Sequence, residues 1–258
     1  MVRVRLTFRT TPVRYIERDR ACRMVFAPKQ KLFFGITPDG YNMDEVDSEA
    51  LADVAYGIFD HLLTRRLQTQ GKYLYALVEN GVDFTADLSE TVRQFTDEYP
   101  QLADALLARF GQVDTIYRML CEGEGVIPSK TTQMYWIVQD APGSAPEAIE
   151  DEHAGKWLIF QEPDGADAAW KKVRDATVAH DLGISAKVST AKPNPDSRDS
   201  RRVIYVYTKD WADEPDVMRV RENLRRLGFV DRIGYKRNLE TFAGEYAKKG
   251  KRVTYYSA

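Results

Sequence analysis

The second half of the chain alternates strand-like and helix-like segments, and this order constrains the fold more than any other feature. Segments rich in β-branched and aromatic residues are separated by two stretches whose apolar residues recur at helical spacing. The strand-like segments are 156–161, 184–190, 201–210, 231–237 and 252–258, and the helix-like segments are 165–183 and 213–229. Both helices are predicted to stop at a glycine, Gly183 and Gly228. Because the strands are long and aromatic, we expect an α+β fold with a curved, mostly antiparallel sheet backed by helices.

The first half has a different pattern, which predicts one long helix, an interrupted helical region and several short strands. The long helix begins near Asp47 or Ser48 and ends before Gly71. Its expected apolar face is Leu51, Val54, Ala55, Ile58, Leu62 and Leu63. Residues 86–121 look helical, with breaks at Pro100 and Gly111. The expected strands are Val2–Arg9, Cys22–Ala27, Lys31–Ile36, 73–78 and 131–138, the last of which could belong to either half.

A polar segment, QDAPGSAPEAIEDEHAG at 139–155, separates the two halves and is typical of a linker. The charge changes sign across it: residues 1–150 hold 16 basic and 22 acidic side chains, whereas residues 151–258 hold 21 basic and 17 acidic ones. We therefore predict two domains with different roles. The expected division is an acidic α+β domain of unknown role at 1–138, a linker at 139–152, and a second domain at 153–258.

Several classes of protein fit this composition poorly. No apolar run approaches the roughly 18–20 residues that span a bilayer, and the first residues, MVRVRLTFRT, lack the apolar block of a signal peptide. Cys22 and Cys121 are too few and too far apart for a disulfide framework or a zinc site. The net charge of −2 does not suit a dedicated binder of duplex DNA. We expect a cytoplasmic protein with no membrane partner, metal or cofactor.

Strand alternation gathers basic and phenolic side chains on one face of the predicted sheet. Lys187 shares its strand face with Ser185 and Ser189, while Ala186 and Val188 point to the other side. If the strands are neighbours, further residues join that face: Lys156, Tyr205, Tyr207, Lys236 and Arg237. A mixture of forked, mobile and neutral donors suits a phosphate group. The alternative is that these lysines are solvated residues that protect the sheet from edge pairing.

The second half resembles a known family in the order of its blocks: GKWLIF, AAWKKV, LGISAKVST, VIYVYTKDWADEPDVMRVRENLRRLGF and YKRNLETFAGEY. These blocks, within 153–258, are similar to the family of basophilic leukaemia-expressed protein. That family looks like the cap-binding translation initiation factor 4E in fold. The resemblance implies a curved antiparallel sheet backed by helices, and it says little about activity.

A second resemblance is to bacterial phosphothreonine lyases, through KWLI at 156–159, KVST at 187–190, IYVYTK at 204–209 and YKRN at 235–238. It implies that Lys187 is the base that removes the α-proton of a phosphothreonine. Lys156, Arg237 and Tyr207 would hold the phosphate, with Lys236 and Arg201 or Arg202 nearby. One departure is serious, because Leu158 stands where the lyases carry a histidine acid. His153 and His180 are the histidines in this half that could replace it.

Three functions therefore remain open. The first is recognition of a phosphate-bearing ligand, such as a phosphopeptide, by a lyase-like domain with doubtful elimination activity. The second is a cap-like nucleotide or single-stranded RNA binding module, in which Trp211 and Tyr205 or Tyr207 stack on bases. Trp157 and Trp170 are expected in the core instead, because strand and helix periodicity bury them. The third is a protein-interaction adaptor without a small ligand.

Overall fold

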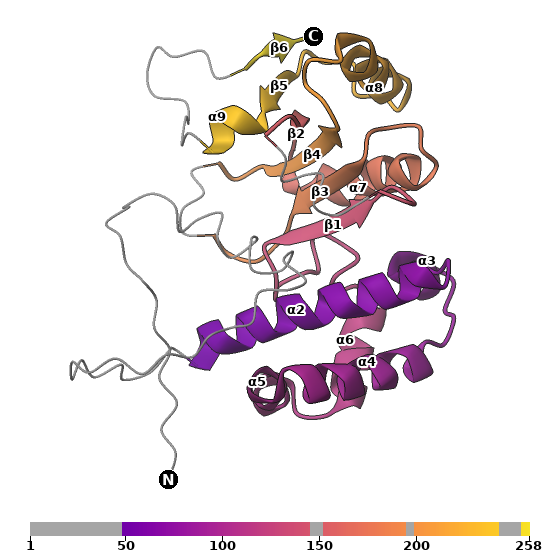
Figure 1. The fold of residues 1–258 in the computed structure, drawn as a ribbon, viewed down its shortest axis with the longest axis vertical. Coiled ribbons are helices and arrows are strands. Elements are labelled where there is room, and N and C mark those ends of the chain that lie inside the picture. The colour runs from indigo at the N-terminus through magenta and orange to yellow at the C-terminus, as the bar shows by residue number, and fades with distance from the viewer. Residues whose placement is uncertain (1–47, 145–151, 195–198, 243–253) are drawn as a thin grey trace, which may run out of the picture.

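The computed structural model of the protein describes residues 48–144, 152–194, 199–242 and 254–258. The predicted strands Val2–Arg9, Cys22–Ala27 and Lys31–Ile36 lie outside these ranges, as do residues 145–151 of the predicted linker. In the described part, a group of helices lies beside a mixed unit of strands and helices (Figure 1).

The helical unit confirms the long helix and the interrupted helical region of the first half. Its elements are α2 (Ser48–Thr69), α3 (Leu74–Glu79), α4 (Thr85–Glu98), α5 (Pro100–Phe110) and α6 (Val113–Glu122). Pro100 begins α5, where its missing N–H costs nothing. Gly111 adopts a φ of 79° between α5 and α6, a value that few other residues tolerate. The breaks thus fall at the predicted residues and for the predicted reasons.

The buried face of α2 is rotated from the predicted one. The residues with at most 3% exposure are Ala52, Ala55, Tyr56, Phe59, Leu63 and Leu67. Val54, which we expected inside, is 38% exposed. Two large aromatic side chains explain the rotation, since burying Tyr56 and Phe59 removes more apolar surface from water than burying smaller aliphatic ones.

The strand predicted at 73–78 is wrong, because these residues form the short helix α3. Tyr and Val favour strands only where a neighbouring strand offers backbone partners. Here the segment lies between Gly71 and Gly81, both with positive φ, and it places Leu74 into the helical core. Tertiary context therefore overrides the local preference.

The second unit is built on a six-stranded sheet in which every pair of neighbours is antiparallel. The strands are β1 (Trp136–Asp140), β2 (Gly155–Gln161), β3 (Ser185–Ser189), β4 (Arg202–Thr208), β5 (Gly234–Arg237) and β6 (Tyr256–Ser257). Their order is β1-β3-β4-β2-β5-β6. Together with α7 (Pro163–Val178), α8 (Glu214–Arg226) and α9 (Asn238–Phe242), this sheet confirms the predicted α+β class.

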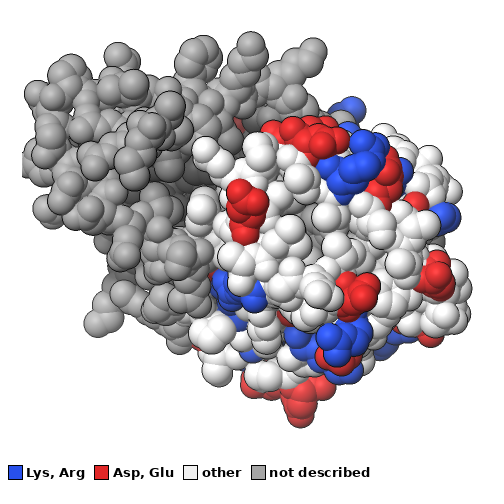
Figure 2. Space-filling view, turned by 90° about the horizontal axis from the view of Figure 1, so that it is seen from below, with Lys and Arg blue, Asp and Glu red and all other residues white. Residues whose placement is uncertain are grey.

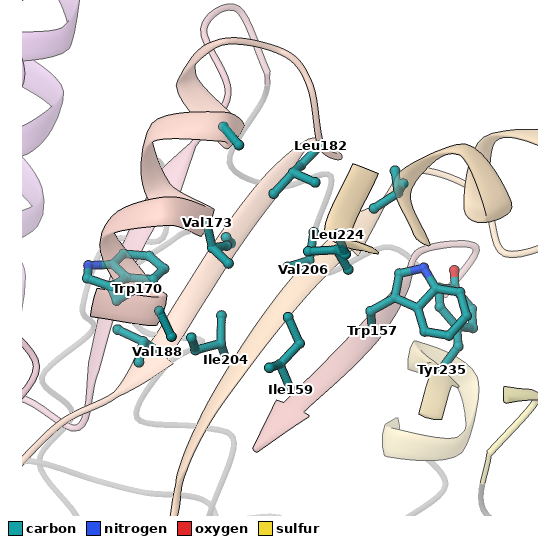
Figure 3. Close-up of a cluster of buried hydrophobic side chains, with 14 of the residues drawn as sticks. Trp157, Ile159, Trp170, Val173, Leu182, Val188, Ile204, Val206, Leu224 and Tyr235 are labelled. Carbon is teal, nitrogen blue, oxygen red and sulfur yellow. The ribbon is translucent and has the colours of Figure 1, made fainter. Parts of the chain in front are cut away.

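Helices α7 and α8 cover one face of this sheet and enclose its core (Figure 3). Trp157 and Trp170 are 0% and 1% exposed, as predicted from their periodicity. The Trp157 indole N–H donates to the Val217 carbonyl at 3.1 Å, which fastens α8 to β2. Helix α7 ends at Val178, earlier than the predicted stop at Gly183.

The two units are joined by more than the chain connection. Strand β1 belongs to the sheet, because it pairs with β3 from Trp136↔Ser189 to Asp140↔Ser185. The first two residues of the predicted linker, Gln139 and Asp140, are therefore sheet residues. The Arg174 side chain of α7 donates to Glu79 of α3 at 2.8 Å. The division into two domains stays a prediction.

The exposed end of the helical unit carries charged side chains of both signs, interspersed over the described surface visible in Figure 2. Within the described ranges, no helix is long and apolar enough to cross a membrane. The same residues contain no cluster of three or more His, Cys, Asp or Glu side chains that could hold a metal ion.

Candidate functional site

The sheet face that α7 and α8 do not cover gathers lysines and aromatic rings. Alternation along each strand places Ala186, Val188, Ile204 and Val206 in the core, all 0% exposed, and turns their neighbours to the other side. We call this opposite side the lysine face. Its members are Trp136 of β1, Lys187 of β3, Tyr205 and Tyr207 of β4, Lys156 of β2, and Lys236 of β5.

The strand register brings these side chains into two adjacent rows across the sheet. In one row, Lys187 lies opposite Tyr205. In the next, Tyr207 lies opposite Lys156, which in turn lies opposite Lys236. Neighbouring strands are about 4.8 Å apart, so Lys156 and Lys236 are direct neighbours, whereas Lys187 lies two strand spacings from Lys156 on the same face. Sequence reasoning predicted this convergence for Lys156, Lys187, Lys236 and the tyrosines.

Trp136 forms the aromatic side of the lysine face. Its ring stacks on that of Tyr205, with centroids 5.2 Å apart and planes inclined by 29°. The Lys187 ammonium nitrogen lies 4.5 Å from the Trp136 ring centroid and 5.4 Å from that of Tyr205. Cation–π attraction of this kind holds the lysine over the two rings. Trp136 was not predicted as a site residue, although its place one residue before buried Ile137 in a strand pattern would have put it on this face.

Lys156 and Lys236 are the most buried lysines of the face, with 7% and 8% exposure. The Lys156 ammonium group donates to the Asn238 side-chain oxygen at 3.2 Å and lies 5.3 Å from the Tyr207 ring centroid. Two like charges directly opposite each other across a strand pair are unfavourable. Burial makes the repulsion stronger, because water screens the charges less.

Arg237 does not join the lysine face. It follows Lys236 and therefore points to the opposite side of the sheet. Its guanidinium group lies 4.7 Å from the Trp211 ring centroid and 4.3 Å from that of Tyr255, and it is bound to Glu240 at 2.6 Å. Trp211, predicted as an exposed base stacker, is therefore packed against an arginine and a tyrosine. These contacts suit a structural cluster that holds the end of β5.

The two predicted arginines lie at the start of β4, next to the end of β2 that is far from Lys156. Arg201 is bound to Asp199 at 2.8 Å, and its guanidinium carbon lies 4.9 Å from the Phe160 ring centroid. Arg202 begins β4 opposite Gln161 of β2. Neither arginine occupies the rows that hold the three lysines.

The two histidines considered as acids lie in different places. His180 follows α7 in the helix layer, with a φ of 62°, and this layer covers the core side of the sheet. His153 precedes β2, and its carbonyl accepts a hydrogen bond from the Trp211 backbone N–H. Leu158, at the position of the lyases' acid, lies opposite Tyr205 and in line with Lys187. The centre of the lysine face is therefore apolar where elimination needs a proton donor.

The family model for "Basophilic leukemia-expressed protein Bles03" matches residues 150–242 of this chain. This match covers the strands and helices that carry most of the lysine face. Trp136 lies outside it.

Among solved structures, the chain is similar to eIF4E-3 of C. elegans in complex with the 4E-binding protein Mextli and a cap analog. The identity is 18%, the match covers 42% of this chain and 65% of that one, and the TM-score is 0.35. A schistosome eIF4E with m7GpppA and 4E-BP matches at 15% identity, over 42% and 61% of the chains, with a TM-score of 0.34. Ascaris suum eIF4E-3 with m2,2,7G cap matches at 17%, over 45% and 64%, with a TM-score of 0.31. This chain thus spans less than two thirds of each of these structures, and none of these matches is to a phosphothreonine lyase.

Proposed function

We propose that the lysine face binds a nucleotide without transforming it. The observation that carries this proposal is the interleaving of Lys156, Lys187 and Lys236 with aromatic rings on one side of the sheet. Lysines supply the charge that phosphate groups require. The Trp136 and Tyr205 rings supply a flat apolar surface of the kind on which bases stack, at about 1–3 kcal/mol per base. A phosphopeptide would use the lysines but leave the aromatic rings without a role.

The rows of the sheet define how a bound nucleotide would be oriented on the lysine face. Lys156 and Lys236 lie in one row, whereas Trp136 lies two rows away. Residues in neighbouring rows of one strand are about 6.6 Å apart, from a rise of roughly 3.3 Å per residue. Two rows therefore span about 13 Å. We infer that the phosphates point toward the lysine pair and that the base lies on the Trp136 and Tyr205 rings.

Elimination of phosphate from phosphothreonine is not part of the proposal. Removal of an α-proton by Lys187 would have to be accompanied by protonation of the departing phosphate. Leu158 cannot supply that proton, and His180 lies in the helix layer on the other side of the sheet. The histidine that the lyases use as the acid is replaced by Leu158, and this loss favours binding over elimination.

Titration with a panel of ligands tests the proposal. We expect ATP, GTP and a methylated guanosine triphosphate to quench tryptophan fluorescence and to release heat in calorimetry, with affinity falling as salt rises. Lys187→Met should weaken binding about tenfold, the effect of losing one hydrogen bond between charged groups. Trp136→Phe should remove most of the quench and retain most of the affinity.

Lys130→Met is the matched control, because Lys130 is an exposed lysine outside the lysine face. It should bind like the unmodified protein. If no nucleotide binds, or if Lys187→Met and Lys130→Met bind equally well, the proposal is wrong. A phosphothreonine peptide belongs in the same panel, and a product lighter by one phosphoric acid would show that the face is a lyase site.

A further inference from the structure

Phe160 is an exposed aromatic residue on the side of the sheet that carries the lysine face. In β2, Trp157 and Ile159 point into the core, and alternation turns Phe160 to the opposite side, where it is 43% exposed. Burying a phenylalanine normally stabilises a protein by about 1.5–3 kcal/mol, so an exposed ring on a sheet surface calls for a reason.

Arg201 covers this ring with a second flat surface. Its guanidinium carbon lies 4.9 Å from the Phe160 ring centroid. Asp199 fixes the guanidinium group through two hydrogen bonds, to Nε at 3.1 Å and to Nη2 at 2.8 Å. These hydrogen bonds lower the pKa of Asp199 to about 2, so the pair stays charged at neutral pH. Phe160 and Arg201 thus form an oriented aromatic and guanidinium pair, and both kinds of plane stack on bases.

The register places Phe160 in the same row as Trp136. Trp136 lies opposite Ser189 of β3, and Phe160 lies opposite Val203 of β4. The Val203 backbone N–H donates to the Ser189 hydroxyl at 2.9 Å, which joins the two halves of the row. Three strand spacings separate the aromatic residues, a distance of roughly 14 Å. A single base cannot stack on both rings.

We propose that the ligand of the lysine face is a single-stranded oligonucleotide, with one base on Trp136 and another on the Phe160–Arg201 pair. This inference rests on the proposed nucleotide binding and adds a second base platform to it. Between the two platforms the row holds Ser189 and Val203. Both side chains are small, so a sugar–phosphate chain could cross the sheet surface above them. Lys187 and Tyr205 lie in the adjacent row, within reach of the phosphates.

Length dependence tests this proposal. Oligoadenylates of one, two, three and five nucleotides are titrated against the full chain at fixed salt, with fluorescence quenching and calorimetry as readouts. We expect affinity to rise about tenfold or more between the mononucleotide and the shortest oligomer that reaches both platforms. Phe160→Ala should remove that rise and leave mononucleotide affinity unchanged. Phe160→Tyr should keep it, because the ring is retained.

Val230→Ala is the control for loss of an exposed apolar side chain, since Val230 is 69% exposed in the loop between α8 and β5. It should bind every length like the unmodified chain. Equal affinity for all lengths, or a rise that survives in Phe160→Ala, would overturn the second platform while leaving nucleotide binding intact. A duplex that competes as well as the single strand would also overturn it, because paired bases cannot stack on protein rings. Absence of mononucleotide binding would instead count against the proposed function itself.

Discussion

At the residue scale, the position with the most unusual environment is Asp60, a carboxylate in the core of the helical unit. Its Oδ1 atom is buried and makes no hydrogen bond within the described structure. Burial, and then the negative charge of Glu124, raise the pKa of Asp60 to about 7. Glu124 accepts hydrogen bonds from the backbone N–H groups of Thr132 and Gln133, at 2.8 and 3.2 Å. These bonds favour its charged form, so we infer that Asp60 carries the proton of the pair.

This environment predicts how stability depends on pH. In the unfolded chain Asp60 ionises near pH 4, whereas in the folded protein it holds its proton up to about pH 7. The folded state binds more protons in this window, so stability is lost as pH rises from about 4 to 7. Asp60→Asn should remove the loss and stabilise the protein by about 2–4 kcal/mol at pH 8. Urea unfolding at several pH values measures the free energy of unfolding of both proteins.

Asp104→Asn is the control for that experiment, because Asp104 is an exposed aspartate of α5. Its free energy of unfolding should follow that of the unmodified protein across the pH range. If Asp60→Asn changes stability by the same amount at pH 5 and pH 8, then Asp60 does not ionise in this window and the assignment fails.

At the scale of single elements, the sequence predicted strands and helices well where periodicity and glycines or prolines agreed. The helix boundaries predicted at Pro100, Gly111 and Gly228 lie where expected, because the local backbone decides them. Proline cannot continue a preceding helix, and the two glycines adopt a positive φ. Prediction failed where a contact distant in sequence decides the outcome. Gly183 seemed to be a helix stop, but its role is to let two strands approach, and only the folded sheet reveals that role.

Gly183 lies against the β4 backbone. A Cβ atom at this position would come within 1.8 Å of the Tyr207 carbonyl oxygen. The same oxygen accepts a hydrogen bond from the Ile184 N–H at 2.9 Å. Gly183→Ala therefore forces β3 away from β4 and should destabilise the protein by about 1–3 kcal/mol. Because Tyr207 belongs to the lysine face, the proposed affinity for nucleotides should fall as well.

The matched change is Gly57→Ala in α2, where a Cβ atom meets nothing within 4 Å. A glycine in the middle of a helix is less favourable than alanine, so this variant should gain about 0.5–1 kcal/mol. Thermal unfolding of the two variants should thus shift in opposite directions. A neutral Gly183→Ala would show that the strands can separate at no cost.

At the scale of the whole molecule, the common face of Lys156, Lys187 and Lys236 could be predicted, because in every strand alternate residues point to the same side of the sheet. The same rule places Arg237 on the opposite face, because it follows Lys236 in β5, so its assignment to the lysine face misapplied alternation. The contacts between the two units were beyond prediction. Arg174 of α7, only 3% exposed, binds Glu79 of α3. Asp53 of α2 binds Lys192, which follows β3.

These contacts should make the two units unfold together. All four tryptophans, Trp136, Trp157, Trp170 and Trp211, lie in the unit that holds the sheet, so their fluorescence reports on that unit alone. Far-ultraviolet circular dichroism, which is dominated by α-helices, reports on both units, and helices α2–α6 contribute most of its signal. The two signals should change at the same temperature in the unmodified protein, which is the signature of a single transition. Separate transitions there would instead support two independent domains.

Removing two of the ion pairs between the units should separate the two transitions. Asp53→Asn removes the carboxylate that α2 offers to Lys192, and Arg174→Met removes the guanidinium group that α7 offers to Glu79 of α3. We expect the dichroism and fluorescence midpoints to differ by at least about 2–4 °C, the shift that 1 kcal/mol produces in a chain of this size. Arg93→Met controls for loss of an ion pair as such, because Glu90 and Asp97, the partners of Arg93, lie in its own helix α4. If its midpoints stay together while those of the double variant separate, the contacts between the units are what makes the chain fold as one body.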